Sequence, residues 1–132
     1  MTVNELYVKL NERIPASLSC EWDNDGLMCS SDGEREVKKA LVCLDVTVDA
    51  VKKAVSEGFD VIVSHHPFIF KGLKSVTEND FIPQKAIGLI RAGISVMSFH
   101  TRLDAADGGV NDRLASLLGV KTPYPLARAS EE

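Results

Sequence analysis

The three histidines of the chain stand at the ends of two short apolar segments, and a carboxylate follows the last of them. His65 and His66 are adjacent, and His100 precedes Asp104 by four residues. Imidazole and carboxylate together are the usual ligands of zinc, iron, manganese and nickel, and donors drawn from separate segments are typical of catalytic metal centres. We therefore predict a metal site with His65, His66 and Asp104 as ligands, and with His100 as a catalytic residue that moves a proton.

The adjacent histidines also bear on how many ions such a site would hold. Successive side chains of an extended strand point to opposite sides, so His65 and His66 are not expected to turn toward one ion. They could serve two ions a few ångströms apart, which is a common hydrolytic arrangement. The alternative is that the pair forms a solvated turn, but its coincidence with His100 and Asp104 favours metal.

A predicted sheet positions these groups. Apolar segments at 40–44, 61–64 and 94–99 alternate with two helical patterns, one after Thr47 and one over 82–91. This order is the signature of right-handed βαβ crossovers, so the fold class is α/β, with βαβ units forming a mainly parallel sheet flanked by helices. Ligands of such sheets bind just past the carboxyl ends of the strands, which is where the candidate ligands stand.

Two further helices are expected outside this alternation. Thr2 and Glu5 form a capping box, and apolar residues then recur at helical spacing until Pro15. A last helix with one apolar face begins near Gly109. The segment 40–44 is continuously apolar, which predicts a strand that is covered on both faces.

Four features near the candidate site allow two interpretations each. Asp45 is more simply a hydrogen-bond acceptor for the helix at Thr47 than a ligand. The Asp-Asn-Asp-Gly sequence at 23–26 is interpreted as a turn, because it lacks the pattern of a calcium loop. Trp22 is interpreted as a core or interface anchor rather than a substrate platform. Residues 107–109 are interpreted as a turn, although their N–H groups could face an anion.

Composition excludes several classes of protein. The chain has 132 residues, of which 45% are hydrophobic and 26% charged, and its net charge is -4. These values are typical of one folded domain. The Lys and Arg residues are scattered along the sequence and do not form the basic cluster expected of a nucleic-acid-binding surface. No apolar run is long enough to span a membrane, and Cys20, Cys29 and Cys43 form an odd set without C-x-x-C spacing. We expect reduced structural thiols, a cytoplasmic location, and neither nucleic acid nor membrane as partner.

The sequence resembles the Nif-three-like family, also known as GTP cyclohydrolase I type 2 homologues, in the blocks EWDNDGL, ALVCLDVT, VIVSHHPFIFKGLKSVT and SFHTRLDAADGGVND. The resemblance covers nearly the whole chain. It implies an α/β fold of two related halves, a dinuclear metal site and a ring-shaped homohexamer. It also implies that His65 and His66 bind different metals, that Asp104 binds one of them, and that His100 lies beside the site.

The chain departs from this family in one respect. Members complete the dinuclear site with a His-x-x-x-Glu motif near the end of a longer chain, and no histidine follows His100 here. We therefore interpret residues 1–132 as a single α/β domain that forms the amino-terminal half of a two-part protein. The polar tail, 126–132, either frays or continues into a longer native chain. Arg102 lies inside the His-to-Asp segment, and a cation beside paired metals is unfavourable unless it faces a substrate anion such as phosphate.

Two functions are compatible with these residues. The first is a metal-dependent hydrolase that uses two divalent ions, zinc, iron, manganese or nickel, on a nucleotide or another phosphate-bearing small molecule. GTP ring opening is implied by the resemblance alone, since the sequence has no Walker-type phosphate loop. The alternative is a non-enzymatic metal-binding or regulatory scaffold that acts through protein partners. The sequence leaves open whether the chain is an enzyme.

Overall fold

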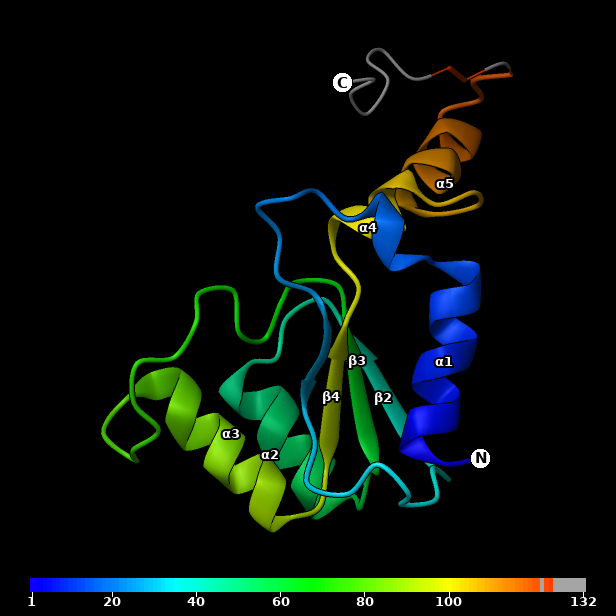
Figure 1. Ribbon diagram of the computed structural model, residues 1–132. Helices are drawn as coiled ribbons and strands as arrows, with labels where there is room; N and C mark the ends of the chain where they lie inside the picture. Colours follow the sequence, from blue (N-terminus) through cyan, green and yellow to red (C-terminus); the bar gives the residue numbers. More distant parts are fainter. Residues whose placement is uncertain (122, 125–132) are drawn as a thin grey trace.

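A four-stranded mixed sheet in the order β1-β4-β3-β2 forms the centre of the fold (Figure 1). The computed structural model describes residues 1–121, 123 and 124, so the expectations for the tail at 126–132 lie outside the described residues. The strands are β1 (Gly26–Cys29), β2 (Ala40–Cys43), β3 (Val61–Ser64) and β4 (Ser95–Ser98). Strands β2, β3 and β4 are parallel, and β1 pairs antiparallel with β4. The predicted α/β fold with a mainly parallel sheet is confirmed.

The edge strands differ from the sequence-based expectation. Strand β1 is not among the predicted strands, because a four-residue segment is recognisable mainly through its pairing with β4. Strand β2 lies at the other edge of the sheet, and Val42 is 77% exposed and Leu44 58% exposed. The prediction that the segment 40–44 is covered on both faces is therefore wrong for the described part of the chain. A continuous apolar run does not distinguish a central strand from an edge strand.

The first two α-helices begin at threonines whose side chains cap them. The helices are α1 (Val3–Arg13), α2 (Val48–Ser56), α3 (Phe81–Arg91), α4 (Thr101–Ala105) and α5 (Val110–Leu117), with a 3₁₀ turn η1 (Ala16–Leu18). The predicted capping box is confirmed: the Thr2 hydroxyl accepts from the Glu5 N–H at 3.2 Å, and the Glu5 carboxylate accepts from the Thr2 N–H at 2.9 Å. Thr47 itself caps α2, since its hydroxyl accepts from the Ala50 N–H at 3.1 Å. None of the helices in this described part has the length and hydropathy to cross a bilayer.

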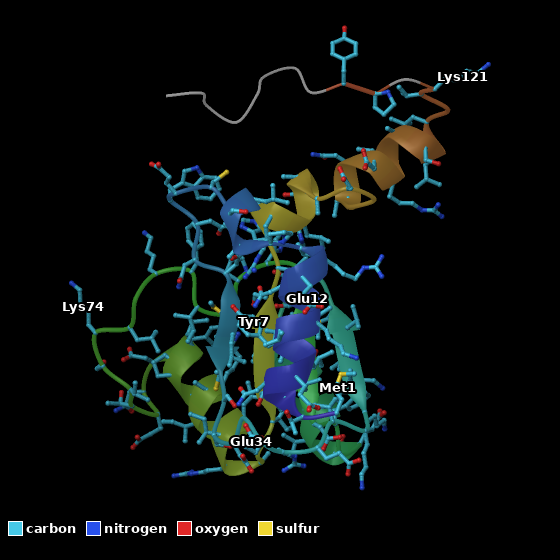
Figure 2. The ribbon with its side chains drawn as sticks, turned by 45° about the vertical axis from the view of Figure 1, so that its right-hand side comes forward. Met1, Tyr7, Glu12, Glu34, Lys74 and Lys121 are labelled. Carbon is cyan, nitrogen blue, oxygen red and sulfur yellow. The ribbon has the colours of Figure 1, made fainter. Side chains whose placement is uncertain are left out.

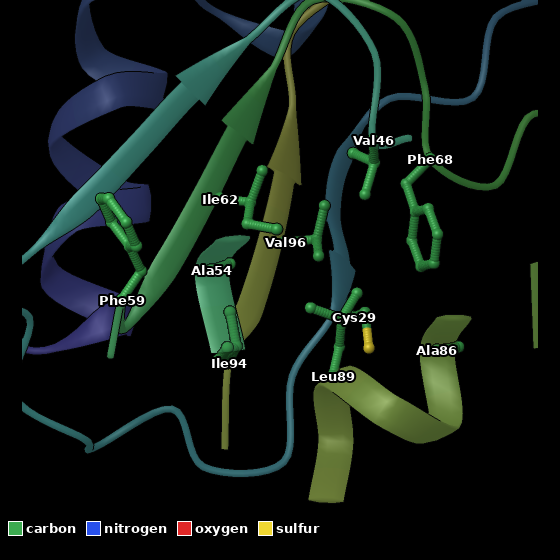
Figure 3. Close-up of a cluster of buried hydrophobic side chains, with 10 residues drawn as sticks. All are labelled: Cys29, Val46, Ala54, Phe59, Ile62, Phe68, Ala86, Leu89, Ile94 and Val96. Atoms are coloured by element: carbon green, nitrogen blue, oxygen red, sulfur yellow. The ribbon is translucent and has the colours of Figure 1, made fainter. Parts of the chain in front are cut away.

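The sheet has a hydrophobic layer on each face. Helices α2 and α3 cover one face, and α1 lies along the other (Figures 1 and 2). Between the sheet and α2 and α3 lies a buried cluster: Cys29, Val46, Ala54, Phe59, Ile62, Phe68, Ala86, Leu89, Ile94 and Val96 (Figure 3). Beneath α1 a smaller cluster contains Val3, Val61, Met97 and Phe99. Burial on both faces holds β3 and β4 rigid, so residues just past their ends have a fixed position.

Helix α5 extends away from the sheet (Figure 1). The predicted helix near Gly109 is confirmed, and the turn before it contains Gly108 with φ of 71°. Its apolar face is open in the part of the chain that is described, since Leu114 is 53% exposed and Leu117 69% exposed. Sequence periodicity thus predicts the helix but does not show what covers its apolar face.

Asp60 joins the segment before β2 to the start of β3. Its carboxylate accepts hydrogen bonds from the Lys38 N–H at 2.9 Å and the Lys39 N–H at 3.0 Å, and it pairs with Arg35 at 3.0 Å. Burial alone would raise the pKa of Asp60, but these hydrogen bonds and the guanidinium outweigh burial and lower that pKa. The carboxylate form therefore stabilises the fold.

The variant Asp60→Asn should lower the free energy of unfolding by about 2 kcal/mol at neutral pH. Because the folded-state pKa is lowered, this stabilisation is complete above the ordinary value of about 3.9 and is lost as pH falls below it. Urea unfolding at several pH values should show the difference between wild type and variant shrinking toward about pH 3. The control is Asp107→Asn, an exposed carboxylate before α5. A pH-independent difference would refute this role.

Candidate metal centre

The register of the sheet brings the candidate residues together. Cys43 is paired with Ser64 and Ser64 with Ser98, so the three parallel strands end at the same level. The residues one or two positions beyond these ends are Asp45, His65, His66 and His100. The convergence predicted from the strand ends is therefore seen in the structure.

The chain bends directly after β3. The Ser64 hydroxyl donates to the His66 carbonyl at 2.9 Å and contacts the hydroxyl of Ser98 at 2.9 Å. The backbone is no longer extended at this point, so the rule that successive side chains diverge does not apply. The rings of His65 and His66 have centroids 5.1 Å apart, and those of His65 and His100 are 5.3 Å apart. Ring nitrogens from all three histidines lie within 4.8 Å of one another.

Hydrogen bonds fix which nitrogen of each ring faces outward. His65 Nδ1 lies 3.0 Å from the carbonyl oxygen of Phe99. A carbonyl oxygen only accepts, so Nδ1 must carry the proton and Nε2 keeps its lone pair. His66 Nδ1 lies 2.8 Å from a carboxylate oxygen of Asp45, which orients that ring in the same way. A histidine that donates from one nitrogen to a carbonyl or carboxylate is the usual arrangement around a metal ion.

His100 is held by Asp23, a residue of the loop before β1. Its Nδ1 lies 3.0 Å from a carboxylate oxygen of Asp23, whose side chain is fully buried. Burial would raise the pKa of Asp23, but hydrogen bonds from Thr101, His100 and the N–H of Asn24 outweigh it and lower that pKa. The carboxylate therefore stays charged and accepts a hydrogen bond from Nδ1. All three histidines thus have Nε2 available at one place.

Asp104, on helix α4, lies beside the three-histidine cluster and approaches one of its members, His65. It lies four residues after His100, which is about one helical turn, and its Oδ1 is 3.7 Å from His65 Nε2. This distance is too long for a hydrogen bond. It fits two ligands of one ion, because bonds of about 2.0–2.2 Å place neighbouring ligand atoms roughly 3–4 Å apart.

Two residues of the site have partners that the sequence does not predict. The Asp45 side chain is expected to accept hydrogen bonds from the start of α2, but it contacts His66, and Thr47 alone supplies the side-chain cap. Asp23 is expected only to form a turn, but it contacts His100 and Thr101. The role of Asp23 follows from the antiparallel pairing of β1 with β4. This pairing brings the residues before β1 to the edge of the sheet where β2, β3 and β4 end.

Arg102 does not face a substrate anion. Its guanidinium is 1% exposed, pairs with the buried Asp25 at 3.0 Å, and donates to the Asn11 side chain at 2.6 Å. It also lies 4.7 Å from the centroid of Phe99. Gly26 is required beside it, since its φ is 115° and a Cβ there would lie 3.1 Å from the guanidinium. Arg102 therefore links α1, α4 and the loop before β1.

Comparison with known proteins identifies the family. Residues 1–131 match the family described as Duf34/NIF3 (NGG1p interacting factor 3). The chain belongs to the NIF3 family. A protein of Staphylococcus aureus strain Mu50, named GTP cyclohydrolase 1 type 2 homolog, is 39% identical over 92% of this chain and 32% of its own length. A protein of the same name from Clostridium perfringens strain 13 is 34% identical over 90% of this chain and 45% of its own length.

Solved structures agree with this NIF3 assignment. The chain superposes on reduced HcgD from Methanocaldococcus jannaschii with a TM-score of 0.89 and 33% identity, over 97% of this chain and 51% of the other. A Bacillus cereus protein related to NIF3 gives a TM-score of 0.87 and 33% identity, over 96% and 35%. The predicted family resemblance is confirmed. This NIF3 chain spans 32% and 45% of the lengths of these two curated relatives, which is less than half of each.

Proposed function

We propose that this chain supplies the metal-binding part of a metal-dependent hydrolase with two divalent ions. The observation that carries the proposal is the convergence of His65, His66 and His100, each with Nδ1 held by a partner and with ring nitrogens within 4.8 Å of one another. Such preorganisation is expected of ligands, whereas solvated histidines need no fixed ring orientation. Zinc, iron, manganese and nickel all accept this donor set, and nothing in it selects among them.

His65, His66 and Asp104 would hold the ions, as predicted from sequence. Bound ions of this kind lower the pKa of a coordinated water and so supply a nucleophile near neutral pH. His100 is proposed to move a proton at Nε2, since Asp23 engages its Nδ1 and fixes the orientation of the ring. Two imidazoles and one carboxylate are few ligands for two ions. We therefore propose that residues 1–132 form an amino-terminal half and that further ligands come from the rest of the protein.

The substrate, assembly and location are also proposals. The curated relatives carry the name GTP cyclohydrolase 1 type 2 homolog, which makes GTP, a nucleotide and a phosphate-bearing small molecule, the first substrate to test. The family resemblance supports a homohexamer, and the reduced cysteines support a cytoplasmic location. Neither nucleic acid nor membrane is proposed as a partner.

A second candidate function is a metal-binding scaffold that regulates a protein partner. The family description, NGG1p interacting factor 3, names an interaction with another protein. The open apolar face of α5, with Leu117 69% exposed, is compatible with such a role in the described part of the chain. The two functions differ in whether bound metal produces turnover.

The test is turnover by the whole gene product that contains residues 1–132, after removal of metal and reloading with each of the four divalent ions. The hydrolase proposal predicts a metal-dependent change in the ultraviolet spectrum of the GTP purine ring. The variant His100→Gln should lower kcat by about 10²–10⁴-fold while leaving metal content unchanged. Metal binding without turnover of GTP or other nucleotides would overturn the hydrolase proposal and favour the scaffold.

A further inference from the structure

Trp22, the only tryptophan of the chain, is exposed at the rim of the histidine cluster. Its ring centroid lies 6.3 Å from that of His100, with an interplanar angle of 79°. On another side the centroid of Phe70 lies 6.3 Å away at 71°. Trp22 is 64% exposed and Phe70 47% exposed, so two large apolar side chains meet water beside the candidate metal centre. Trp22 is therefore not a core residue among the described residues, whereas its interpretation as an interface anchor stays a prediction.

The loop that carries Trp22 is anchored on both sides. Ahead of it, the Cys20 N–H donates to the Thr101 hydroxyl at 3.0 Å. After it, Asp23 accepts from the Thr101 N–H at 3.1 Å, and the Asn24 side chain donates to the Ile69 carbonyl at 2.6 Å. The last bond joins this loop to the loop of Phe70. Trp22 and Phe70 thus keep their positions relative to each other and to the cluster.

We propose that Trp22 is a stacking platform, braced by Phe70, for a planar aromatic ring of the substrate. With 64% of its surface exposed, the indole retains open area on which another ring can stack. Its contact with His100 would place a stacked ring next to the proposed catalytic group. An indole held in position before the ligand arrives loses little entropy on binding, which strengthens stacking. The inference rests on the proposed function, because it names the class of substrate for the same site.

The size of the aromatic patch favours a small ligand over a second copy of the chain. A stable protein interface buries about 800 Å² on each partner. Trp22 and Phe70 are only two side chains, and the neighbouring groups His100 and Asp23 are polar and engaged with each other. A single ring system stacked on the indole needs no larger surface.

Because Trp22 is the only tryptophan, its fluorescence reports directly on the platform. The probes are guanosine, uridine and ribose, which lack phosphate and so avoid direct phosphate contacts to metal. We expect saturable quenching of wild-type fluorescence by guanosine, weaker quenching by uridine and none by ribose, in both metal-free and metal-loaded protein. Equal quenching by guanosine and ribose would overturn the proposal. So would a fluorescence change that depends on the concentration of protein and not on the concentration of guanosine.

Variants separate the platform from the metal centre. By calorimetry, Trp22→Leu should weaken guanosine binding about tenfold or more, whereas Trp22→Phe should retain most of it. The matched control, Tyr124→Leu, alters an aromatic side chain that is 83% exposed and should leave binding unchanged. Unchanged binding in Trp22→Leu would overturn the platform. Metal content, measured on the same samples, should be equal in Trp22→Leu and wild type. If neither protein bound metal, the hydrolase proposal would fail while the stacking proposal would still be tested by guanosine binding.

Discussion

Replacing Arg102 with methionine is expected to lower the free energy of unfolding by about 3–5 kcal/mol. The guanidinium is buried, and its removal leaves the carboxylate of Asp25, 4% exposed, without its cation. It also removes the hydrogen bond to Asn11 and the contact with Phe99. Urea unfolding followed by circular dichroism would measure the loss.

Two further variants control this result. Arg91→Met changes an exposed arginine in the last turn of α3 and should cost less than about 1 kcal/mol. In the double variant Arg102→Met with Asp25→Asn, no buried carboxylate is left unpaired, so part of the lost stability should return. A loss for Arg102→Met no larger than that of Arg91→Met would contradict the assignment of Arg102 as a structural cross-link.

The second large effect concerns Asp45, which orients His66 from outside the cluster. The variant Asp45→Ala removes the acceptor 2.8 Å from His66 Nδ1, so the ring can rotate and change its tautomer. Metal affinity should fall by about 10- to 100-fold, the usual cost of losing such a partner. Asp45→Asn keeps an acceptor oxygen and should lose less. Competition with a coloured chelator would measure the affinities.

The control for Asp45 is Asp49→Ala. Asp49 is an exposed carboxylate in the first turn of α2 and carries the same charge. If charge alone near the cluster set the affinity, both variants would weaken metal binding to a similar degree. That outcome would contradict the orienting role of Asp45.

The predictable part of the site depends on local sequence. The histidines follow β-branched apolar runs, and parallel strands in register carry the residues after each run to one edge of the sheet. Strand pattern and the topology of parallel sheets are therefore enough to place His65, His66 and His100 together. Asp104 joins them because its spacing from His100 equals about one helical turn.

The unpredicted part depends on contacts between segments far apart in the chain. Asp23 reaches His100 across 77 positions, and Asp25 reaches Arg102 across the same separation, because β1 pairs antiparallel with β4. A loop composition of Asp, Asn and Gly fits a turn and carries no sign of these partners. The exposure of Val42 was also not predictable from local sequence. The order of the strands decides which strand lies at the edge of the sheet, and the composition of a strand does not reveal that order.

Metal content of the purified protein tests the central claim most directly. Apoprotein would be incubated with each divalent ion, desalted, and analysed by native mass spectrometry beside the variant His65→Ala/His66→Ala/His100→Ala. We predict at least one bound ion per wild-type chain and none in the variant, with circular dichroism showing both folded. Equal metal content in the two proteins, or no metal in either, would contradict a metal centre built on these histidines.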